Sequence, residues 1–102
     1  MNIVGIAACT AGIAHTYIAK EKLTNVAEDR GHVISLETQG LSGTQDELEQ
    51  KDIDNADVVL IAADIKIGGR ERFEGKKVVE VPTSLVVKSP TKLVEKLEEL
   101  TI

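Results

Sequence analysis

Short apolar runs alternate along this chain with segments whose apolar residues recur at helical spacing. Continuous apolar runs of this length are typical of strands buried on both faces of a sheet. The predicted strands are residues 3–8, 32–38, 58–63 and 77–81. The predicted helices are residues 12–30, residues 47–55, a helical turn at 70–73, and a last helix that begins at Pro90. The pattern therefore predicts strands and helices in alternation.

The first and last helices are predicted from apolar stripes and from end signals. Gly31 supplies the stop of the first helix, and Ser89 as N-cap with Pro90 at the first position opens the last one. The stripe of the first helix is Ala19, Leu23, Val26 and Ala27. The stripe of the last helix is Leu93, Val94, Leu97 and Leu100. Between them, a flexible polar stretch at 41–44 precedes the short helix, for which Thr44 and Glu47 match a capping box.

Alternating strands and helices predict an α/β fold with a parallel sheet and right-handed crossovers. We expect a three-layer sandwich of the flavodoxin or Rossmann-like type. Its four-stranded parallel sheet has the order 2-1-3-4, with helices on both faces. The chain has 102 residues, no repeat, no low-complexity tract and no linker, so residues 1–102 are expected to form a single domain.

Composition narrows the classes of function. The net charge of −5 and the near absence of aromatic residues, only Tyr17 and Phe73, argue against nucleic-acid binding. No apolar run approaches the roughly 20 residues that span a bilayer, and the first residues lack the features of a signal peptide. A single cysteine forms no internal disulfide, and a reactive thiol needs a reducing compartment. We expect a soluble, cytoplasmic protein.

The single cysteine, Cys9, follows the first strand in a short loop that contains Gly12 and leads into the first helix. Backbone N–H groups and the helix dipole make such a loop an anion site. The same groups favour a thiolate over a thiol and would stabilise a phosphoryl group attached to the sulfur. Cys9 is therefore predicted to be a nucleophile that takes up a phosphoryl group. The alternative is that Cys9 is a small buried apolar residue, as many free cysteines are.

His15 lies six residues after Cys9, where cysteine phosphatases carry an arginine that clamps phosphate oxygens. A histidine there could donate a hydrogen bond to the phosphate or take the phosphoryl group itself, or it could simply bond nearby backbone at the helix start. Thr10 and Thr16 offer hydroxyls to a phosphate, with N-capping as their alternative role. One cysteine and one histidine are too few ligands for zinc, so no metal and no cofactor is predicted.

Other polar residues follow the remaining strands. Because sites in open parallel sheets form at the carboxyl ends of strands, Cys9, the segment 37–40 and the segment 64–66 should gather at one edge. Asp64 could act as a general acid, or it could be an ordinary turn aspartate. Tyr17 and Ile18 lie off the apolar stripe and are candidates for a partner surface or for a second packing contact. Five basic residues lie close together in the sequence: Lys66, Arg70, Arg72, Lys76 and Lys77. This basic segment could bind an acidic partner or the incoming phosphate, or it could be a solvated loop.

Several stretches together resemble one family. Residues 8–17, Ala-Cys-Thr-Ala-Gly-Ile-Ala-His-Thr-Tyr, are similar to the Cys-Pro-Thr-Gly-Ile-Ala-His-Thr loop of fructose-type enzyme IIB components. These components belong to the bacterial phosphoenolpyruvate-dependent sugar phosphotransferase system. Further matches follow in the family's order and cover nearly the whole chain: Glu37-Thr38-Gln39-Gly40, Asp52-Ile53, Ala56-Asp57-Val58, Ala62-Ala63-Asp64, Arg72-Phe73, Gly75-Lys76 and Val79-Glu80-Val81-Pro82.

The resemblance implies a phosphocarrier, which is an enzyme of the phosphotransferase class. A phosphohistidine on a IIA partner would pass its phosphoryl group to Cys9. The phosphocysteine would then pass it to a sugar held by the membrane permease IIC, with which the protein would associate peripherally. The residues around the phosphate would be Thr10, Ala11, Gly12, Ile13, Ala14, His15 and Thr16, with Asp64 and Lys66 as accessory residues.

One local departure concerns the loop itself. The family's Pro-Thr after the cysteine is replaced by Thr10-Ala11, which frees one backbone N–H, loosens the loop and moves a hydroxyl to Thr10. Physical chemistry favours a carrier over a hydrolase, since histidine in place of the clamping arginine should slow attack by water.

Two other functions stay open. The first is a small cysteine phosphatase or arsenate-reductase-like enzyme with Cys9 as nucleophile and Asp64 as acid. The second is a non-catalytic domain that senses phosphorylation. Fructose is the sugar expected by default, with mannose-type and related ketose or polyol substrates open, and a monomer is expected.

Overall fold

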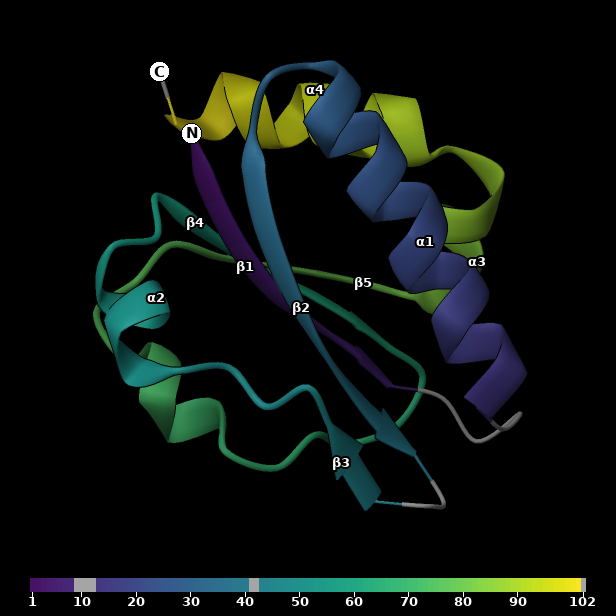
Figure 1. The fold of residues 1–102 in the computed structure, drawn as a ribbon, viewed down its shortest axis with the longest axis vertical. Coiled ribbons are helices and arrows are strands. Elements are labelled where there is room, and N and C mark those ends of the chain that lie inside the picture. Colours follow the sequence, from purple (N-terminus) through teal and green to yellow (C-terminus); the bar gives the residue numbers. More distant parts are fainter. Residues whose placement is uncertain (9–12, 41–42, 102) are drawn as a thin grey trace.

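A five-stranded sheet forms the centre of the molecule, which is described by a computed structural model (Figure 1). The structure describes residues 1–8, 13–40 and 43–101; of residues 13–16 and 40 it describes the backbone only. The strands are β1 Asn2–Ala8, β2 Val33–Gly40, β3 Gly43–Gln45, β4 Val58–Ala63 and β5 Val78–Val81. The helices are α1 Ile13–Asp29, α2 Gln50–Asp54, α3 Thr83–Lys88 and α4 Pro90–Thr101, with a 3₁₀ turn, η1, at Arg70–Phe73.

The sheet order is β3-β2-β1-β4-β5. Strand β1 is parallel to β2 and to β4, and β4 is parallel to β5. The α/β class and the order 2-1-3-4 of the four parallel strands are therefore confirmed. The number of strands differs from the prediction, because β3 adds an antiparallel edge strand beside β2.

Strand β3 occupies a stretch that was predicted to be flexible. It pairs with the end of β2 through Thr38 with Gln45, Gln39 with Thr44, and Gly40 with Gly43. A strand this short and polar has no apolar alternation to mark it, so only its pairing with β2 reveals it. The predicted capping box of Thr44 and Glu47 was also wrong. Thr44 lies in β3, and α2 starts after Glu49, which makes no side-chain capping hydrogen bond.

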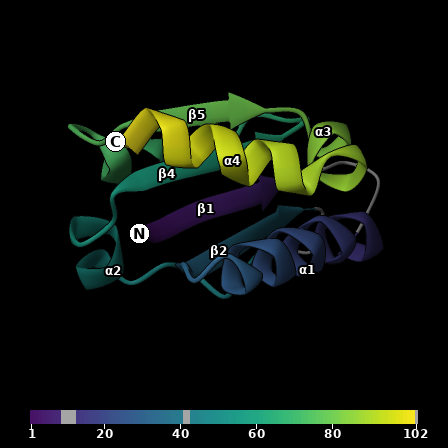
Figure 2. The same cartoon turned by 90° about the horizontal axis from the view of Figure 1, so that it is seen from above.

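The two faces of the sheet are covered by different elements (Figures 1 and 2). On one face, α1, α3 and α4 pack on a core to which β4 contributes Val58, Leu60 and Ala62. On the other face, α2 and η1 cover a core that includes Ala8, Val59 and Ile61. Alternate residues of the central strands thus enter opposite cores, as the period of two requires, and helices lie on both faces as predicted.

Gly5 allows β1 to lie close to its neighbours. A Cβ atom at this position would lie 2.4 Å from the carbonyl oxygen of Leu60 and 2.8 Å from Cδ2 of Leu36. The glycine is required by this close approach, because larger residues would collide with the backbone of β4.

Helix α3 was not predicted. Its consecutive β-branched residues Val86 and Val87 have low helix propensity, but Val86 is fully buried in the core between α1 and α4, and this packing outweighs the local preference. The last helix starts at Pro90, as predicted, and the backbone oxygen of Ser89 accepts from the N–H of Leu93 at 3.1 Å. Leu93, Val94 and Leu97 are buried as expected, whereas Leu100 is 38% exposed, so its place in the buried stripe was wrong. None of the described helices is long and apolar enough to cross a membrane.

Candidate functional site

The carboxyl ends of the central strands meet at one edge of the sheet. Ala8, the last residue of β1, is in register with Gln39 of β2 on one side and with Ala63 of β4 on the other. Figure 2 shows the arrowheads of β1, β2 and β5 pointing to the same end of the molecule, where α3 lies. Residues 37–40, at the end of β2, and the segment that follows β4 therefore lie on either side of the end of β1, as predicted.

The predicted nucleophile follows β1 directly. Cys9, Thr10, Ala11 and Gly12 lie outside the described residues, but Ala8 before them and the backbone of α1 after them are described. The structure thus confirms a strand end and a helix start on either side of the loop.

The first turn of α1 contains the next four predicted phosphate-binding residues. The backbone of Ile13, Ala14, His15 and Thr16 is helical, and their side chains lie outside the described residues. No acidic residue lies in this turn, so no carboxylate of the turn itself opposes an anion there. The alternative roles of His15 and of the threonine hydroxyls stay predictions.

Asp64 links the end of β1 to the start of α3. Its backbone N–H donates to the carbonyl oxygen of Ala8 at 2.9 Å. Its carboxylate accepts from the N–H of Thr83 at 3.1 Å and from the Thr83 hydroxyl at 2.5 Å. Asp64 is exposed and Thr83 is fully buried, so the carboxylate binds the first turn of α3 from outside the core. Asp64 was predicted from the sequence as a site residue and Thr83 was not, although a hydroxyl residue directly after Pro82 was a signal for it.

The predicted basic segment divides into four cations with partners and one without. Arg70 pairs with Glu80 at 2.8 Å, and Arg72 pairs with Glu37 at 2.8 Å. Lys76 donates to backbone oxygens of Asp54 and Ala56, and Lys77 donates to that of Leu100. Lys66 is exposed and, among the residues that the structure describes, has no hydrogen-bond or ion-pair partner. Within this segment, Lys66 is the cation whose charge faces solvent near the edge.

A buried carboxylate lies beneath this edge. Glu37 of β2 is 1% exposed, and both of its oxygens bind the guanidinium of Arg72, at 2.8 and 3.0 Å. Its oxygens also accept from the Gln39 side chain at 2.8 Å and from the backbone N–H of Leu48 at 3.0 Å. Burial by itself raises the pKa of the Glu37 carboxyl, but the hydrogen bonds from Arg72, Gln39 and Leu48 outweigh it and lower the pKa overall. Glu37 is therefore an ionised structural anchor.

Gln39 connects this anchor to the segment between β4 and η1. Its Oε1 accepts from the N–H of Gly68 at 2.9 Å, and its Nε2 donates to the carbonyl oxygen of Gly68 at 3.0 Å. Residues 37–40 were predicted to lie at the edge, but no role was predicted for the Gln39 side chain, because a contact with a residue 29 positions away leaves no local signal.

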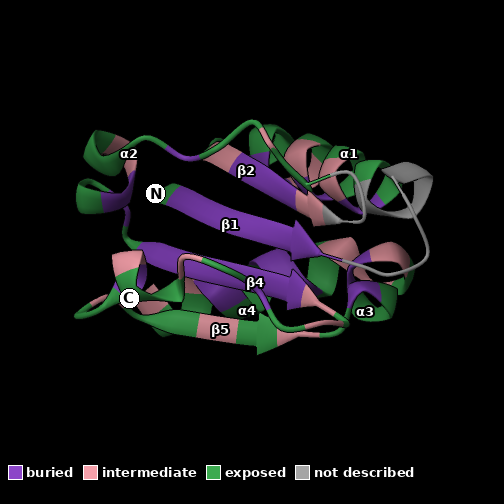
Figure 3. Ribbon diagram, turned by 90° about the horizontal axis from the view of Figure 1, so that it is seen from below, coloured by how far each residue is buried: buried purple, intermediate pink, exposed green. Residues whose placement is uncertain are grey.

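The exposed face of α1 begins beside the same edge. Tyr17 is 42% exposed and Ile18 45% exposed, which confirms that both lie off the buried stripe. The Tyr17 hydroxyl donates to the side-chain oxygen of Gln45, and Lys20 pairs with Asp46 at 2.6 Å. These contacts attach the first turns of α1 to β3. Figure 3 shows exposed positions along the outer side of α1 and buried ones along β1 and β4.

Among the side chains that the structure describes, no group of three or more histidine, cysteine, aspartate or glutamate residues is arranged to hold a metal ion. The described polar groups of the edge instead bind one another and the backbone, and the exposed Lys66 adds positive charge.

Comparison with known proteins agrees with this geometry. A family model described as "PTS system, Lactose/Cellobiose specific IIB subunit" matches residues 4–96. The PTS system fructose-like EIIB component 2 of Escherichia coli (strain K12) is 41% identical over 97 residues, covering 95% of this chain and 92% of that protein. The PTS system fructose-specific EIIABC component of Bacillus subtilis (strain 168) is 38% identical over 95 residues, covering 93% of this chain and 15% of that protein.

A solved structure shows the same fold. The crystal structure of a domain of the fructose-specific IIABC component of Borrelia burgdorferi superimposes with a TM-score of 0.87 at 40% identity, covering 92% of this chain and 89% of that one. Family match, sequence identity and fold agree over nearly the whole chain, so it belongs to the IIB components of the sugar phosphotransferase system, of the fructose type, which are phosphocarriers on the route of a phosphoryl group to a sugar.

Proposed function

We propose that Cys9 is the residue that carries the phosphoryl group in this IIB component. The observation that supports the proposal is its place in the chain, directly after the last residue of the central strand β1 and before the helix that starts at Ile13. Cys9 is also the only cysteine in the sequence. Backbone N–H groups of residues 10–16 would hold the phosphoryl oxygens, with His15 as an additional donor.

The transfer takes place in two displacements. In the first, the Cys9 thiolate attacks the phosphorus of a phosphohistidine on the IIA partner. The S–P bond forms, the P–N bond breaks, and the imidazole leaves with its electron pair. In the second, a sugar hydroxyl attacks the phosphorus, the S–P bond breaks, and Cys9 returns to the thiolate while the hydroxyl proton passes to a base or to water. Each step depends on positioning and charge stabilisation.

The partners are a IIA protein or domain, a IIC permease and a sugar bound by IIC. The Bacillus subtilis relative joins the three parts A, B and C in one chain, which supports both protein partners. The names of the relatives support fructose as the sugar. We further propose that the protein is a cytoplasmic monomer that associates with the membrane only through IIC.

Asp64 and Lys66 would assist from the segment after β4. Lys66 would stabilise negative charge on the thiolate and the phosphoryl group. Both carboxylate oxygens of Asp64 accept hydrogen bonds from Thr83 at the start of α3, whereas the acid of a cysteine phosphatase must donate a proton to the leaving group. This contact supports a carrier over a phosphatase.

Intact-mass analysis tests the proposal. The protein is incubated with phosphoenolpyruvate, the general phosphotransfer proteins and a fructose-type IIA, next to Cys9→Ser and His15→Asn. We expect the mass of one phosphoryl group on wild type and on His15→Asn, and none on Cys9→Ser. An adduct on His15 would move the chemistry to that residue. No adduct with several IIA donors would overturn the assignment of Cys9, and turnover of an aryl phosphate would favour the phosphatase.

A further inference from the structure

We propose that Gln39 is a positioning residue for phosphoryl transfer, because its side-chain amide holds the segment 64–68 across the end of β1, the strand that Cys9 directly follows in the sequence. This inference rests on the proposed role of Cys9 as the phosphoryl carrier.

The course of the segment follows from the strand register. It leaves β4 after Ala63, which is paired with Ala8 on one side, and it reaches Gly68 at the side chain of Gln39, which is paired with Ala8 on the other side. A segment that starts beside one neighbour of β1 and ends at the other must cross the end of β1. Ile67 is 8% exposed and shares a core cluster with Ala8, which places the crossing on the α2 side of the sheet.

Both ends of the crossing are tied by directed hydrogen bonds. At the start, the N–H of Asp64 donates to the Ala8 oxygen at 2.9 Å. At the finish, Gln39 satisfies both the N–H and the C=O of Gly68, at 2.9 and 3.0 Å, as a neighbouring strand would. Two bonds to one residue fix its orientation as well as its distance.

The amide itself has one orientation. Its Nε2 donates to Oε2 of Glu37 at 2.8 Å, and a carboxylate only accepts, so the amide oxygen must face the N–H of Gly68. Glu37 in turn is held by the bidentate contact with Arg72 and is 1% exposed. The buried anchor therefore sets the rotamer of Gln39, and Gln39 sets the position of the segment.

The consequence for transfer concerns Lys66, the exposed residue in the middle of the crossing. With both ends of the segment tied, the backbone of Lys66 stays at the carboxyl edge of the sheet, from which its ammonium would favour the thiolate and the transferring phosphoryl group. Without the hydrogen bonds from Gln39 to Gly68, the segment moves more freely. The Lys66 ammonium then samples a larger volume, and its stabilisation of the thiolate weakens. Gln39 then acts on Cys9 through Lys66, as a positioning residue.

The test compares Gln39→Leu, which removes every hydrogen bond of the amide, with Gln50→Leu as matched control. Gln50 lies in α2, is exposed and bonds only to Asp54 among the described residues. Single-turnover transfer from phosphorylated IIA is measured over a range of IIA concentrations. We expect the limiting rate of Gln39→Leu to fall about tenfold, with unchanged half-saturation by IIA and no change for Gln50→Leu. A wild-type limiting rate in Gln39→Leu would overturn the proposal.

A second readout needs no phosphoryl donor. The pH dependence of Cys9 alkylation by iodoacetamide should move to higher pH in Gln39→Leu and in Lys66→Met, and no further in the double variant. Equal profiles in Gln39→Leu and wild type, or effects that add fully in the double variant, would show that Gln39 does not act through Lys66. Because alkylation does not require a IIA partner, this result stands even if Cys9 accepts no phosphoryl group.

A third measurement keeps the proposal testable if Gln39→Leu folds poorly. Amide hydrogen exchange of the wild type should show a protected N–H at Gly68, and Gln39→Asn, whose amide is too short to reach, should lose that protection while remaining folded by circular dichroism. Fast exchange at Gly68 in the wild type would show that the segment is not held, and the proposal would fail.

Discussion

Arg72 binds Glu37 through two parallel hydrogen bonds, with Nη1 2.8 Å from Oε1 and Nη2 3.0 Å from Oε2. The same guanidinium donates through Nε to the backbone oxygen of Gly69 at 2.7 Å and lies 5.2 Å from the centre of the Phe73 ring. One side chain thus joins β2, η1 and the segment between β4 and η1.

Removing the cation should destabilise the fold strongly. Arg72→Met leaves the carboxylate of Glu37 buried without its charge partner, and breaking a buried pair in this way costs about 3–5 kcal/mol of unfolding free energy. Chemical denaturation measures the loss. The control is Arg70→Met, whose partner Glu80 is 53% exposed and whose removal should change stability little. Equal effects of the two variants would contradict this interpretation.

The pair also predicts a pH dependence. The pKa of Glu37 lies below its ordinary value of 4.5, so the carboxyl contributes stability above that pH and loses the contribution as the pH falls through the lowered pKa. Denaturation of wild type and Glu37→Gln across the acid range should therefore converge at low pH. A constant difference between them would contradict the assignment.

Gly69 should not tolerate a side chain. Its φ of 74° is left-handed, which costs a non-glycine residue roughly 1–2 kcal/mol, and an added Cβ would lie 2.7 Å from Nε of Arg72. Gly69→Ala should therefore displace the guanidinium from Glu37. Gly31→Ala is the control, because Gly31 has a φ of 82° but nothing within 4 Å of its Cβ position. Thermal unfolding should show the larger loss for Gly69→Ala, and similar losses would mean that Arg72 can move aside.

The start of α3 should depend on the Thr83 hydroxyl. Thr83→Val keeps the shape of this fully buried side chain but removes its hydrogen bond to Asp64, which predicts a loss of about 1.5–3 kcal/mol. Ser84→Ala removes a neighbouring exposed hydroxyl and should have little effect. Urea denaturation compares the two variants. An unchanged midpoint for Thr83→Val would show that the bond of Asp64 to the Thr83 backbone is sufficient.

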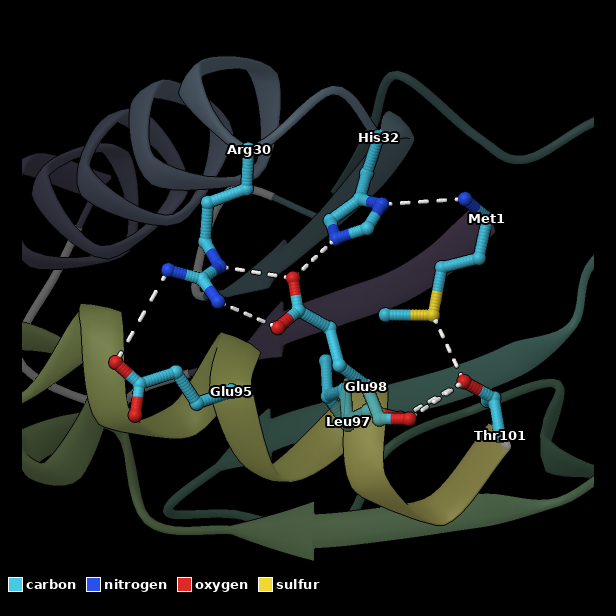
Figure 4. Close-up of polar contacts among 7 residues, drawn as sticks. All are labelled: Met1, Arg30, His32, Glu95, Leu97, Glu98 and Thr101. Carbon is cyan, nitrogen blue, oxygen red and sulfur yellow. Dashed lines mark hydrogen bonds and ion pairs between the residues drawn. The ribbon is translucent and has the colours of Figure 1, made fainter.

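At the opposite end of the sheet, the carboxylate of Glu98 binds two basic side chains, and we expect it to contribute to stability (Figure 4). Oε2 of Glu98 lies 2.8 Å from Nε of Arg30 and 2.5 Å from Nε2 of His32, and Oε1 lies 2.6 Å from Nη2 of Arg30. Hydrogen bonds from Arg30 and then from His32 lower the pKa of Glu98 from 4.5 to about 2. Because its pKa is lowered, the ionised Glu98 carboxylate stabilises the folded protein. This contribution is fully present above pH 4.5 and is lost as the pH falls towards about 2.

Glu98→Gln should therefore be less stable than wild type at neutral pH and equally stable near pH 2. Glu99→Gln is the matched control, since Glu99 is exposed and adjacent. Melting temperatures measured across the acid range check the expectation. If the two variants behave alike at neutral pH, the contacts of Glu98 carry no stability.

Much of the fold could be predicted from local pattern. The buried runs of β1 and β4 and the helical stripe of α1 appear directly in the sequence, since a strand buried on both faces must be apolar throughout and a surface helix must present one apolar side. The order of the four parallel strands and the meeting of their carboxyl ends were predicted as well. The motifs that indicate the family, with the loop around Cys9 first among them, are also local, because the residues of each motif follow one another along the chain.

Features that depend on contacts between residues far apart in the chain were decided only by the tertiary structure. Strand β3 exists because it pairs with the end of β2, and α3 is helical because Val86 is buried between α1 and α4, against its own propensity. The basic segment pointed to an anion or an acidic partner, yet Arg72 binds Glu37 of β2, a residue 35 positions away, and leaves Lys66 exposed. Gln39 and Gly68 likewise meet only when β2 and β4 lie on either side of β1. Hydrogen bonds between residues far apart in the chain leave no periodicity or spacing in the sequence, so only the folded arrangement determines which charges are paired within the protein and which are exposed to solvent.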